Sequence, residues 1–291
     1  VLQAIEEAGY KPGEDVYINY KMENGIVVPT DFRSIATLSV VYLFEQTEEF
    51  FLNNINLDIN DFGKITIHYS PVISFTEGGI SGEFTLFGNA AFSPLDKSFI
   101  IFASSKEEEI PLSLNQGVIT HEFTHAIIDK YTSDTGEYFV YMNFNAIHEG
   151  IADFFAVVHT NRKDYFSLSI PDLGTSRSLP VSWVYEEVEE KAQELYASDF
   201  PAYVIGSVIA SSLIEAQDSI NVGGIEIAQL LFNTFPLLGD SLALEDGDDY
   251  ALYKYLEILS SNSGNNLTVL CTSFKKWFSS IYTDIASCSG I

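Results

Sequence analysis

Two histidines and a glutamate give this chain its strongest candidate for chemistry. The segment His121-Glu122-Phe123-Thr124-His125 has the pattern HExxH. On an α-helix, residues i and i+4 lie on one face a turn apart, so the two imidazoles can bind one metal ion. Glu122, next to the first imidazole, can reach a water molecule at that metal. The pattern therefore predicts half of a hydrolytic zinc site.

A third metal ligand is needed, because zinc in a hydrolytic site has three protein ligands and one open position. The segment 145–155 carries Glu149 and Asp153, again at i and i+4 of a predicted helix. Glu149 would complete a His, His, Glu set. Asp153 is placed to accept the N–H of a ligand imidazole, which fixes the tautomer of the ring and raises its basicity. We predict one zinc ion per chain.

The elements that must position these residues follow from the hydrophobic pattern. Residues before 120 alternate β-branched and aromatic runs with turn residues, and a long helix is predicted over 34–53. The predicted strands cover residues 64–69, 82–87 and 98–103. The predicted helices that follow cover residues near 118–131, 145–160, 184–197, 203–217, 224–235, 248–261 and 266–282.

This order of elements predicts an α+β fold with two lobes. The β-rich N-terminal lobe, residues 1–141, would include the HExxH helix, and residues 142–291 would form a helical C-terminal lobe. We expect the active-site cleft where the two lobes meet.

Charge and composition exclude several classes of protein. Lys and Arg total 14 against 41 Asp and Glu, a net charge of −27, so no basic patch is available for nucleic acid or anionic membranes. The apolar stretches are too short to cross a bilayer, and we expect a soluble chain without a signal or pro-segment. Cys271 and Cys288 can form one disulfide or remain free thiols, and the sequence leaves both open.

The pattern around the zinc ligands resembles the catalytic region of the thermolysin-like zinc metallopeptidases, within the gluzincins. Other segments resemble that family in the expected order: Ile67-His68-Tyr69-Ser70, Asn89-Ala90-Ala91-Phe92, Ile110-Pro111-Leu112-Ser113, Arg177-Ser178 and 224–235. The resemblance implies a two-lobed thermolysin-like fold. It also implies a monomeric metalloendopeptidase, secreted or at the cell surface, that acts on peptides or proteins.

The resemblance also implies how substrate is held. Asn89 with Ala90 and Ala91 would bind the substrate backbone along an edge strand, as in β-augmentation. Leu112 and Val118 match the apolar pocket of the family.

Two further roles are carried over to single residues. Arg177 would bind a substrate carbonyl beyond the scissile bond, and Tyr141 would donate a hydrogen bond to the oxyanion. The proton-donating histidine of the family is missing, because no histidine follows His159, and the best-aligned position holds Tyr203. We expect Tyr203 to supply that hydrogen bond if it faces the cleft.

Two other positions depart from the family pattern. Gly117 and Thr160 stand where many relatives carry acidic calcium ligands, so structural calcium is not expected at that site. Glu109 stands where the pocket usually has an aromatic residue. Of the remaining histidines, His148 is expected in the wall of the pocket and His159 in packing.

The sequence thus predicts a zinc endopeptidase in which Glu122 is the general base. The missing histidine and the altered pocket keep a rival open, a non-catalytic zinc domain of the same fold that binds peptides. A second rival is a structural extracellular module with an empty metal site. Cleavage of a denatured protein, abolished by a chelator, would distinguish the endopeptidase from the non-catalytic zinc domain. Elemental analysis would reveal the structural module, which would contain no zinc.

Overall fold

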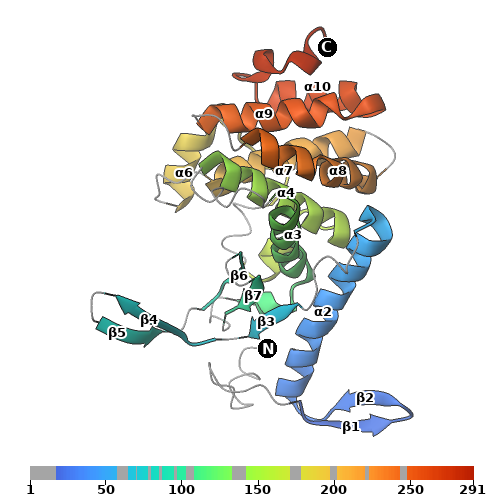
Figure 1. Ribbon diagram of the computed structural model, residues 1–291, viewed down its shortest axis with the longest axis vertical. Helices are drawn as coiled ribbons and strands as arrows, with labels where there is room; N and C mark the ends of the chain where they lie inside the picture. Colours follow the sequence, from blue (N-terminus) through green and yellow to red (C-terminus); the bar gives the residue numbers. More distant parts are fainter. Residues whose placement is uncertain are drawn as a thin grey trace.

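The structure of the protein is a computed structural model (Figure 1). It describes residues 18–57, 65–69, 71–77, 80–84, 87–94, 97–102, 108–132, 142–170, 178–196, 202–219, 223–242 and 248–291. The described part has an α+β fold in which helices predominate and the strands form small sheets in the N-terminal half.

The first described element is a hairpin of β1 (Tyr20–Glu23) and β2 (Ile26–Pro29). Asn24 and Gly25 join the strands with φ angles of 52° and 81°. This is the backbone of a tight hairpin turn, which Asn-Gly adopts at little cost because both residues tolerate positive φ.

Helix α2 (Phe32–Ile55) confirms the helix predicted over 34–53. Asp31 caps its start, because the Asp31 carboxylate accepts the N–H of Ser34 at 2.8 Å. The helix ends at Asn56, which adopts the left-handed conformation with a φ of 59°. In Figure 1 α2 runs from the β1–β2 hairpin to the central helices.

The strands that reach the centre of the molecule form a three-stranded sheet in the order β3 (Thr66–Tyr69), β7 (Ser98–Ile101), β6 (Ala90–Ser93). Strands β3 and β7 are parallel, and β6 and β7 are antiparallel. Within the described residues β6 pairs on one side only, so it is an edge strand. The predicted strands over 64–69 and 98–103 are confirmed. The strand predicted over 82–87 overlaps β5 (Ile80–Phe84), which forms a separate hairpin with β4 (Ile73–Glu77).

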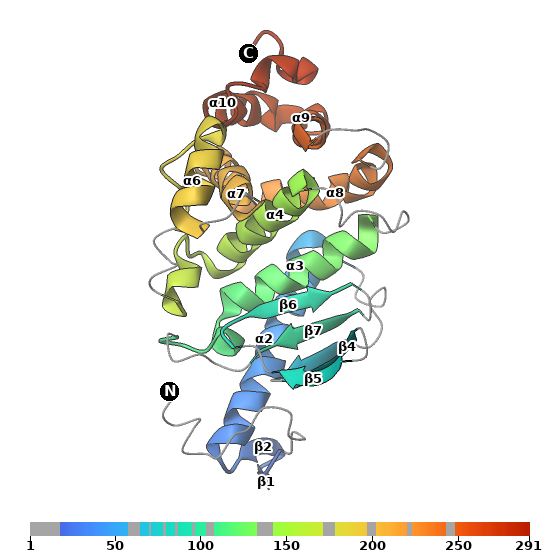
Figure 2. The ribbon, with the colours of Figure 1, turned by 90° about the vertical axis from the view of Figure 1, so that its left-hand side faces the viewer.

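The predicted helices of the second half are present. They are α3 (Gln116–Thr132), α4 (Met142–Thr160), α6 (Val188–Tyr196), α7 (Ala202–Ser219), α8 (Gly224–Leu242), α9 (Asp248–Ser261) and α10 (Leu267–Trp277). Figure 2 shows the sheet on one side of α3 and α4 on the other, with α7 beyond α4. Helix α10 ends before the predicted residue 282, because the chain turns at Phe278 and continues in short 3-10 turns.

Aromatic side chains fix the rotation of α3. Phe123, in the middle of HExxH, is fully buried and lies on the opposite face of the helix from the two histidines. Its ring stacks on Phe99 of β7 and on Phe51 of α2, with both pairs of ring centroids 5.7 Å apart. Because this face is held against α2 and the sheet, the histidines must face α4.

Two glycines let α7 approach α4 closely. A Cβ atom at Gly206 would lie 2.8 Å from Cβ of Glu149, and one at Gly150 would lie 2.7 Å from the carbonyl oxygen of Gly206. Neither position has room for a larger residue unless the helices separate. The crossing therefore occurs at the turn that carries Glu149.

A disulfide joins α10 to the C-terminal turn. It links Cys271 and Cys288, which the sequence left either bridged or free. No helix within the described ranges is both long enough and apolar enough to cross a membrane.

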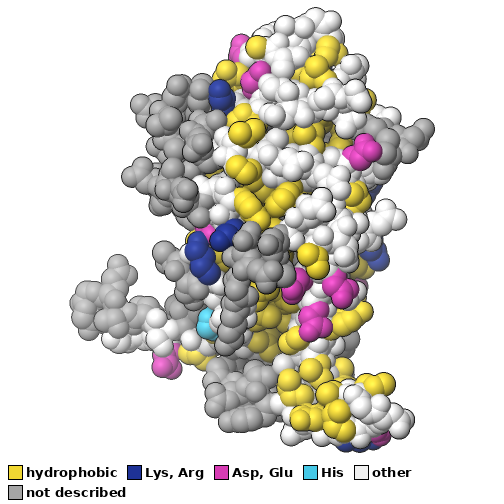
Figure 3. All heavy atoms as spheres, turned by 45° about the vertical axis from the view of Figure 1, so that its right-hand side comes forward, with side chains coloured by type: hydrophobic (Ala, Val, Ile, Leu, Met, Phe, Trp, Pro, Cys, Tyr) yellow, Lys and Arg dark blue, Asp and Glu magenta, His cyan; other side chains and the backbone are white. Residues whose placement is uncertain are grey.

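Exposed apolar side chains gather at the β1–β2 hairpin, on the face shown in Figure 3. Tyr20, Met22 and Ile26 are each more than half exposed there, at 56%, 57% and 66%. These residues belong to a surface separate from the zinc-ligand candidates.

Candidate metal centre

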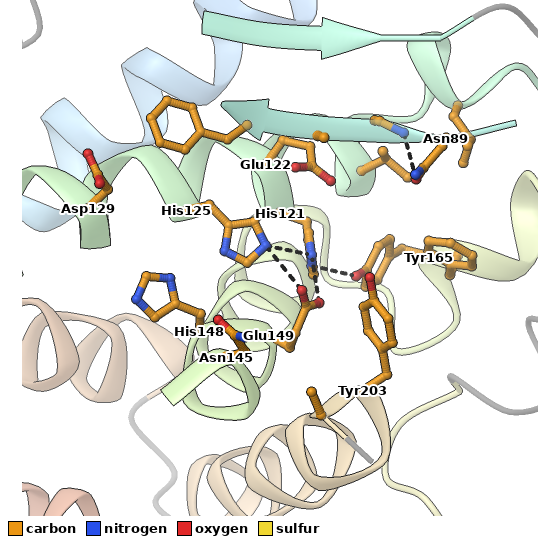
Figure 4. A pocket seen from close by; sticks show the side chains of 17 residues that line it. Asn89, His121, Glu122, His125, Asp129, Asn145, His148, Glu149, Tyr165 and Tyr203 are labelled. Carbon is orange, nitrogen blue, oxygen red and sulfur yellow. Dashed lines mark hydrogen bonds and ion pairs between the residues drawn. The ribbon is translucent and has the colours of Figure 1, made fainter. Parts of the chain in front are cut away.

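His121, His125 and Glu149 converge from α3 and α4 (Figure 4). Nε2 of His121 lies 3.1 Å from Nε2 of His125 and 3.2 Å from Oε2 of Glu149. Nε2 of His125 lies 3.7 Å from Oε1 of Glu149. In a tetrahedral zinc site with metal–ligand bonds of about 2.0–2.1 Å, neighbouring donor atoms are about 3.3 Å apart. The three side chains therefore fit three corners of one zinc tetrahedron.

The charges around His121 favour a cation at this point. Burial by itself lowers the pKa of His121, but the hydrogen bonds and negative charges of Asp153 and Glu149 outweigh burial and raise it to about 10. A group of carboxylates that attracts a proton this strongly also attracts a metal ion, because both neutralise the same buried negative charge.

Asp153 lies behind the first histidine, on the side away from the other donor atoms. Its Oδ1 is 2.9 Å from Nδ1 of His121, and the residue is 1% exposed. The N–H at Nδ1 of His121 donates to Asp153, so a metal ion that displaces the proton from Nε2 would meet a lone pair on the side of His125 and Glu149. This is the tautomer that a metal ligand requires.

Tyr165 joins this pair, and the sequence analysis missed it. Tyr165 opens the 3-10 turn η5 (Tyr165–Leu168) that follows α4, and its hydroxyl donates to Oδ1 of Asp153 at 2.5 Å. The same hydroxyl lies 3.3 Å from Nδ1 of His121. No motif marks Tyr165, because the contact depends on how the turn folds back onto α3.

The three donor atoms open onto a cavity of about 300 Å³ between β6, α3, α4 and α7. It is lined by Asn89, Ala90, Ala91, Phe92, Leu112, Val118, His121, Glu122, His125, Asp129, Asn145, His148, Glu149, Tyr165, Phe166, Ala202 and Tyr203. Glu122 is 7% exposed, and Figure 4 shows its carboxylate beside His121 on the side of β6. It faces the cavity but is not part of the group of metal-ligand atoms.

The residues expected to hold substrate lie on this cavity. Asn89, Ala90 and Ala91 lead into the edge strand β6, and Leu112 and Val118 line the same space. The side-chain oxygen of Asn89 accepts the N–H of Ala90 at 2.9 Å, which holds the start of the strand.

Besides Tyr165, the cavity is lined by residues to which the sequence assigned no role: Phe92, Asp129, Asn145, Phe166 and Ala202. Phe92 and Phe166 add aromatic surface to the wall. Asp129 is 9% exposed and forms an ion pair with Lys97. The sequence could have indicated Asp129 as a cavity residue, because it lies four residues after His125 and so continues the same face of α3 by one turn.

Tyr203 lies at the start of α7 and lines the cavity. Its side chain is 43% exposed and points from α7 into the cavity in Figure 4, so it is not packed in the helical core. Tyr141 and Arg177 lie outside the described residues.

The other two helical histidines serve as walls and packing. His148 is 8% exposed, stacks on His125 with ring centroids 5.8 Å apart, and lines the cavity. Burial, with a smaller effect of the nearby His125, lowers the pKa of His148 to about 3. The ring of His159 stacks on the ring of Phe50, with the centroids 4.4 Å apart, and burial lowers the pKa of His159 to about 4.

Comparison with models of known protein families and with curated protein sequences gives no match. What the structure itself shows is a largely buried group of His121, His125 and Glu149 that can hold a metal ion.

Proposed function

We propose that this protein is a zinc-dependent endopeptidase of the thermolysin-like kind. The observation that carries the proposal is the spacing of His121, His125 and Glu149, which suits zinc, together with Glu122 on the same cavity. The two-lobed arrangement, with residues 1–141 and 142–291 on either side of a cleft, belongs to this proposal.

Zinc bound by the three side chains would act as a Lewis acid on the scissile carbonyl and make the attacking water more acidic. Glu122 takes the proton from that water as it attacks and passes it to the leaving amine. Tyr203, which lines the cavity, donates a hydrogen bond to the oxygen that becomes negative, and Tyr141 is assigned the same task.

The substrate would be an extended peptide. Among the described residues strand β6 has a neighbouring strand on one side only, so a peptide could pair along its other edge as an added strand. Leu112 and Val118, with Phe166, would receive an apolar side chain. Arg177 is assigned to a substrate carbonyl, and the enzyme would act as a monomer.

An oxidising compartment suits this enzyme. The disulfide between Cys271 and Cys288 persists where thiols are not kept reduced. The net charge of −27 keeps such a chain dispersed in solution and disfavours nucleic acid as a partner. We therefore place the protein outside the cell or at its surface.

Glu122→Gln separates the base from the ligands. The variant should retain one zinc per chain and cleave a denatured protein about 10²- to 10⁴-fold more slowly, because the general base is lost while every metal ligand remains. Glu226→Gln, at the start of α8 and away from the cavity, is the matched control and should cleave normally. Near wild-type cleavage by Glu122→Gln would refute the assignment of the base.

A non-catalytic zinc domain that binds peptides is the second candidate. It is favoured by Tyr203, which stands where the resemblance implies a proton-donating histidine. This candidate predicts one zinc per chain and binding of an unfolded peptide, but no chelator-sensitive cleavage. A purified chain that contains no zinc by elemental analysis would exclude both candidates and leave a structural module.

A further inference from the structure

We infer that Tyr165 is a positioning residue that orients the zinc ligand His121 through Asp153. The inference rests on the proposed zinc site and extends it to a residue outside the ligand set. The observation behind it is that three side chains contact one another in series, Tyr165 to Asp153 and Asp153 to His121.

Two donors meet at one oxygen of Asp153. The hydroxyl of Tyr165 is 2.5 Å from Oδ1, and Nδ1 of His121 is 2.9 Å from the same atom. The carboxylate is therefore held from two directions, by the imidazole it orients and by the tyrosine. Since the hydroxyl also lies 3.3 Å from Nδ1 of His121, a rotation of the imidazole would disturb both contacts.

Burial makes this arrangement consequential. Asp153 and Tyr165 are each 1% exposed, so the carboxylate depends on protein donors such as the tyrosine hydroxyl more than on bulk water. A buried carboxylate that loses a charge-assisted hydrogen bond is less stable as the anion and less fixed in direction. Its hold on the tautomer and orientation of His121 weakens as a result.

The fold brings Tyr165 to this position by a close approach to α3. A Cβ atom at residue 117 would lie 2.3 Å from the ring of Tyr165, so the glycine makes room for the ring. Asn115, just before α3, donates to the carbonyl oxygen of Tyr165 at 2.8 Å and to the hydroxyl of Ser169 at 2.9 Å. The turn η5 is thus attached to the start of the helix that carries His121.

Tyr165→Phe tests the hydroxyl while keeping the ring against Gly117. Zinc affinity, measured by competition with a chromophoric chelator, should fall about 10- to 100-fold, as expected when an outer partner of a metal ligand is lost. The absorption spectrum of the cobalt-substituted protein should also change. Tyr255→Phe is the matched control, because Tyr255 is equally buried, in α9, and its hydroxyl has no hydrogen-bond partner among the described residues.

A double-mutant cycle distinguishes positioning from packing. In an Asp153→Asn background, Tyr165→Phe should change zinc affinity by less than about threefold, because the route to His121 is already broken. Equal effects in the two backgrounds would overturn the inference, as would unchanged affinity and cobalt spectrum in Tyr165→Phe alone. If Asp153→Asn does not fold, the single variant and its cobalt spectrum decide.

The two proposals fail differently. A wild-type chain that binds no zinc would overturn the zinc site and this inference together. If the wild type binds zinc and Tyr165→Phe binds it equally tightly, only the role of Tyr165 is overturned.

Discussion

His121 has a carboxylate at each of its two ring nitrogens. Its Nε2 faces Glu149 at 3.2 Å, and its Nδ1 faces Asp153 at 2.9 Å, so both ring nitrogens are committed. The second histidine, His125, has the ring of His148 stacked beside it, with the ring centroids 5.8 Å apart.

Tyr203→Phe tests the position that lacks the expected histidine. The hydroxyl of a cavity tyrosine forms its bond mainly in the transition state, so the variant should lower kcat more than it raises KM. A histidine donor would lose its proton near neutral pH, and the activity would then fall between pH 7 and pH 9. A phenol stays protonated in that range, so we expect no such fall for the wild type. Steady-state kinetics across that range provides the measurement.

Tyr42→Phe, an exposed tyrosine on α2, is the control for Tyr203→Phe and should leave kcat and KM unchanged. A silent Tyr203→Phe in an active enzyme would assign the hydrogen bond to Tyr141 alone or to His148.

At the scale of elements, the crossing of α4 and α7 sets the place of Glu149. Gly206→Ala should destabilise the protein, although alanine normally favours a helix interior over glycine by about 1 kcal/mol. The added methyl group would meet Cβ of Glu149 at 2.8 Å, and overpacking of this kind costs about 1–3 kcal/mol. We therefore expect a lower Tm and weaker zinc binding, measured by calorimetry and chelator competition.

Ser219→Ala, at the exposed end of the same helix, should change neither quantity. A Gly206→Ala variant that is more stable than wild type and binds zinc normally would show that the helices have room to separate.

His159 links α4 to α2 and α3, and this link should depend on pH. Its Nδ1 is 2.8 Å from the hydroxyl of Thr120, and its ring stacks on Phe50. Burial lowers the pKa of His159 to about 4 from the usual 6.5, so the folded state favours the neutral ring. The stabilisation is complete above about pH 6.5 and is lost as the pH falls through 4.

The Tm of the wild type should therefore fall between pH 7 and pH 4 by more than that of His159→Gln, which cannot titrate. His68→Gln, an exposed histidine on β3, serves as the control and should follow the wild type. Parallel curves for His159→Gln and wild type would contradict the prediction.

At the scale of the whole molecule, the effect of calcium on the Tm tests whether a structural calcium site is present. Calcium needs about six to eight oxygen ligands, but the ring of Tyr165 covers Gly117, and the hydroxyl of Thr160 donates to the carbonyl oxygen of Ala156 at 2.7 Å. Millimolar calcium should therefore raise the Tm no more than magnesium at the same ionic strength, since both cations screen the net charge of −27. A calcium-specific rise of many degrees would contradict this.

Local spacing was enough to predict much of the candidate site. The i and i+4 spacing places His121 with His125, and Glu149 with Asp153, on single helix faces, and the structure has these residues on α3 and α4. The helix predicted over 34–53 was confirmed as well, as α2. The absence of acidic residues at Gly117 and Thr160 could also be seen in the sequence.

Tertiary structure decided what lies between those helices. The distances among His121, His125 and Glu149, the contact of Tyr165 with Asp153, and the pairing of Cys271 with Cys288 all join separate segments. Sequence periodicity specifies which face of an element is buried, but not which neighbour covers it or how closely. That distance depends on packing, here on glycines that let backbones approach and on an aromatic ring that fills the space beside one of them.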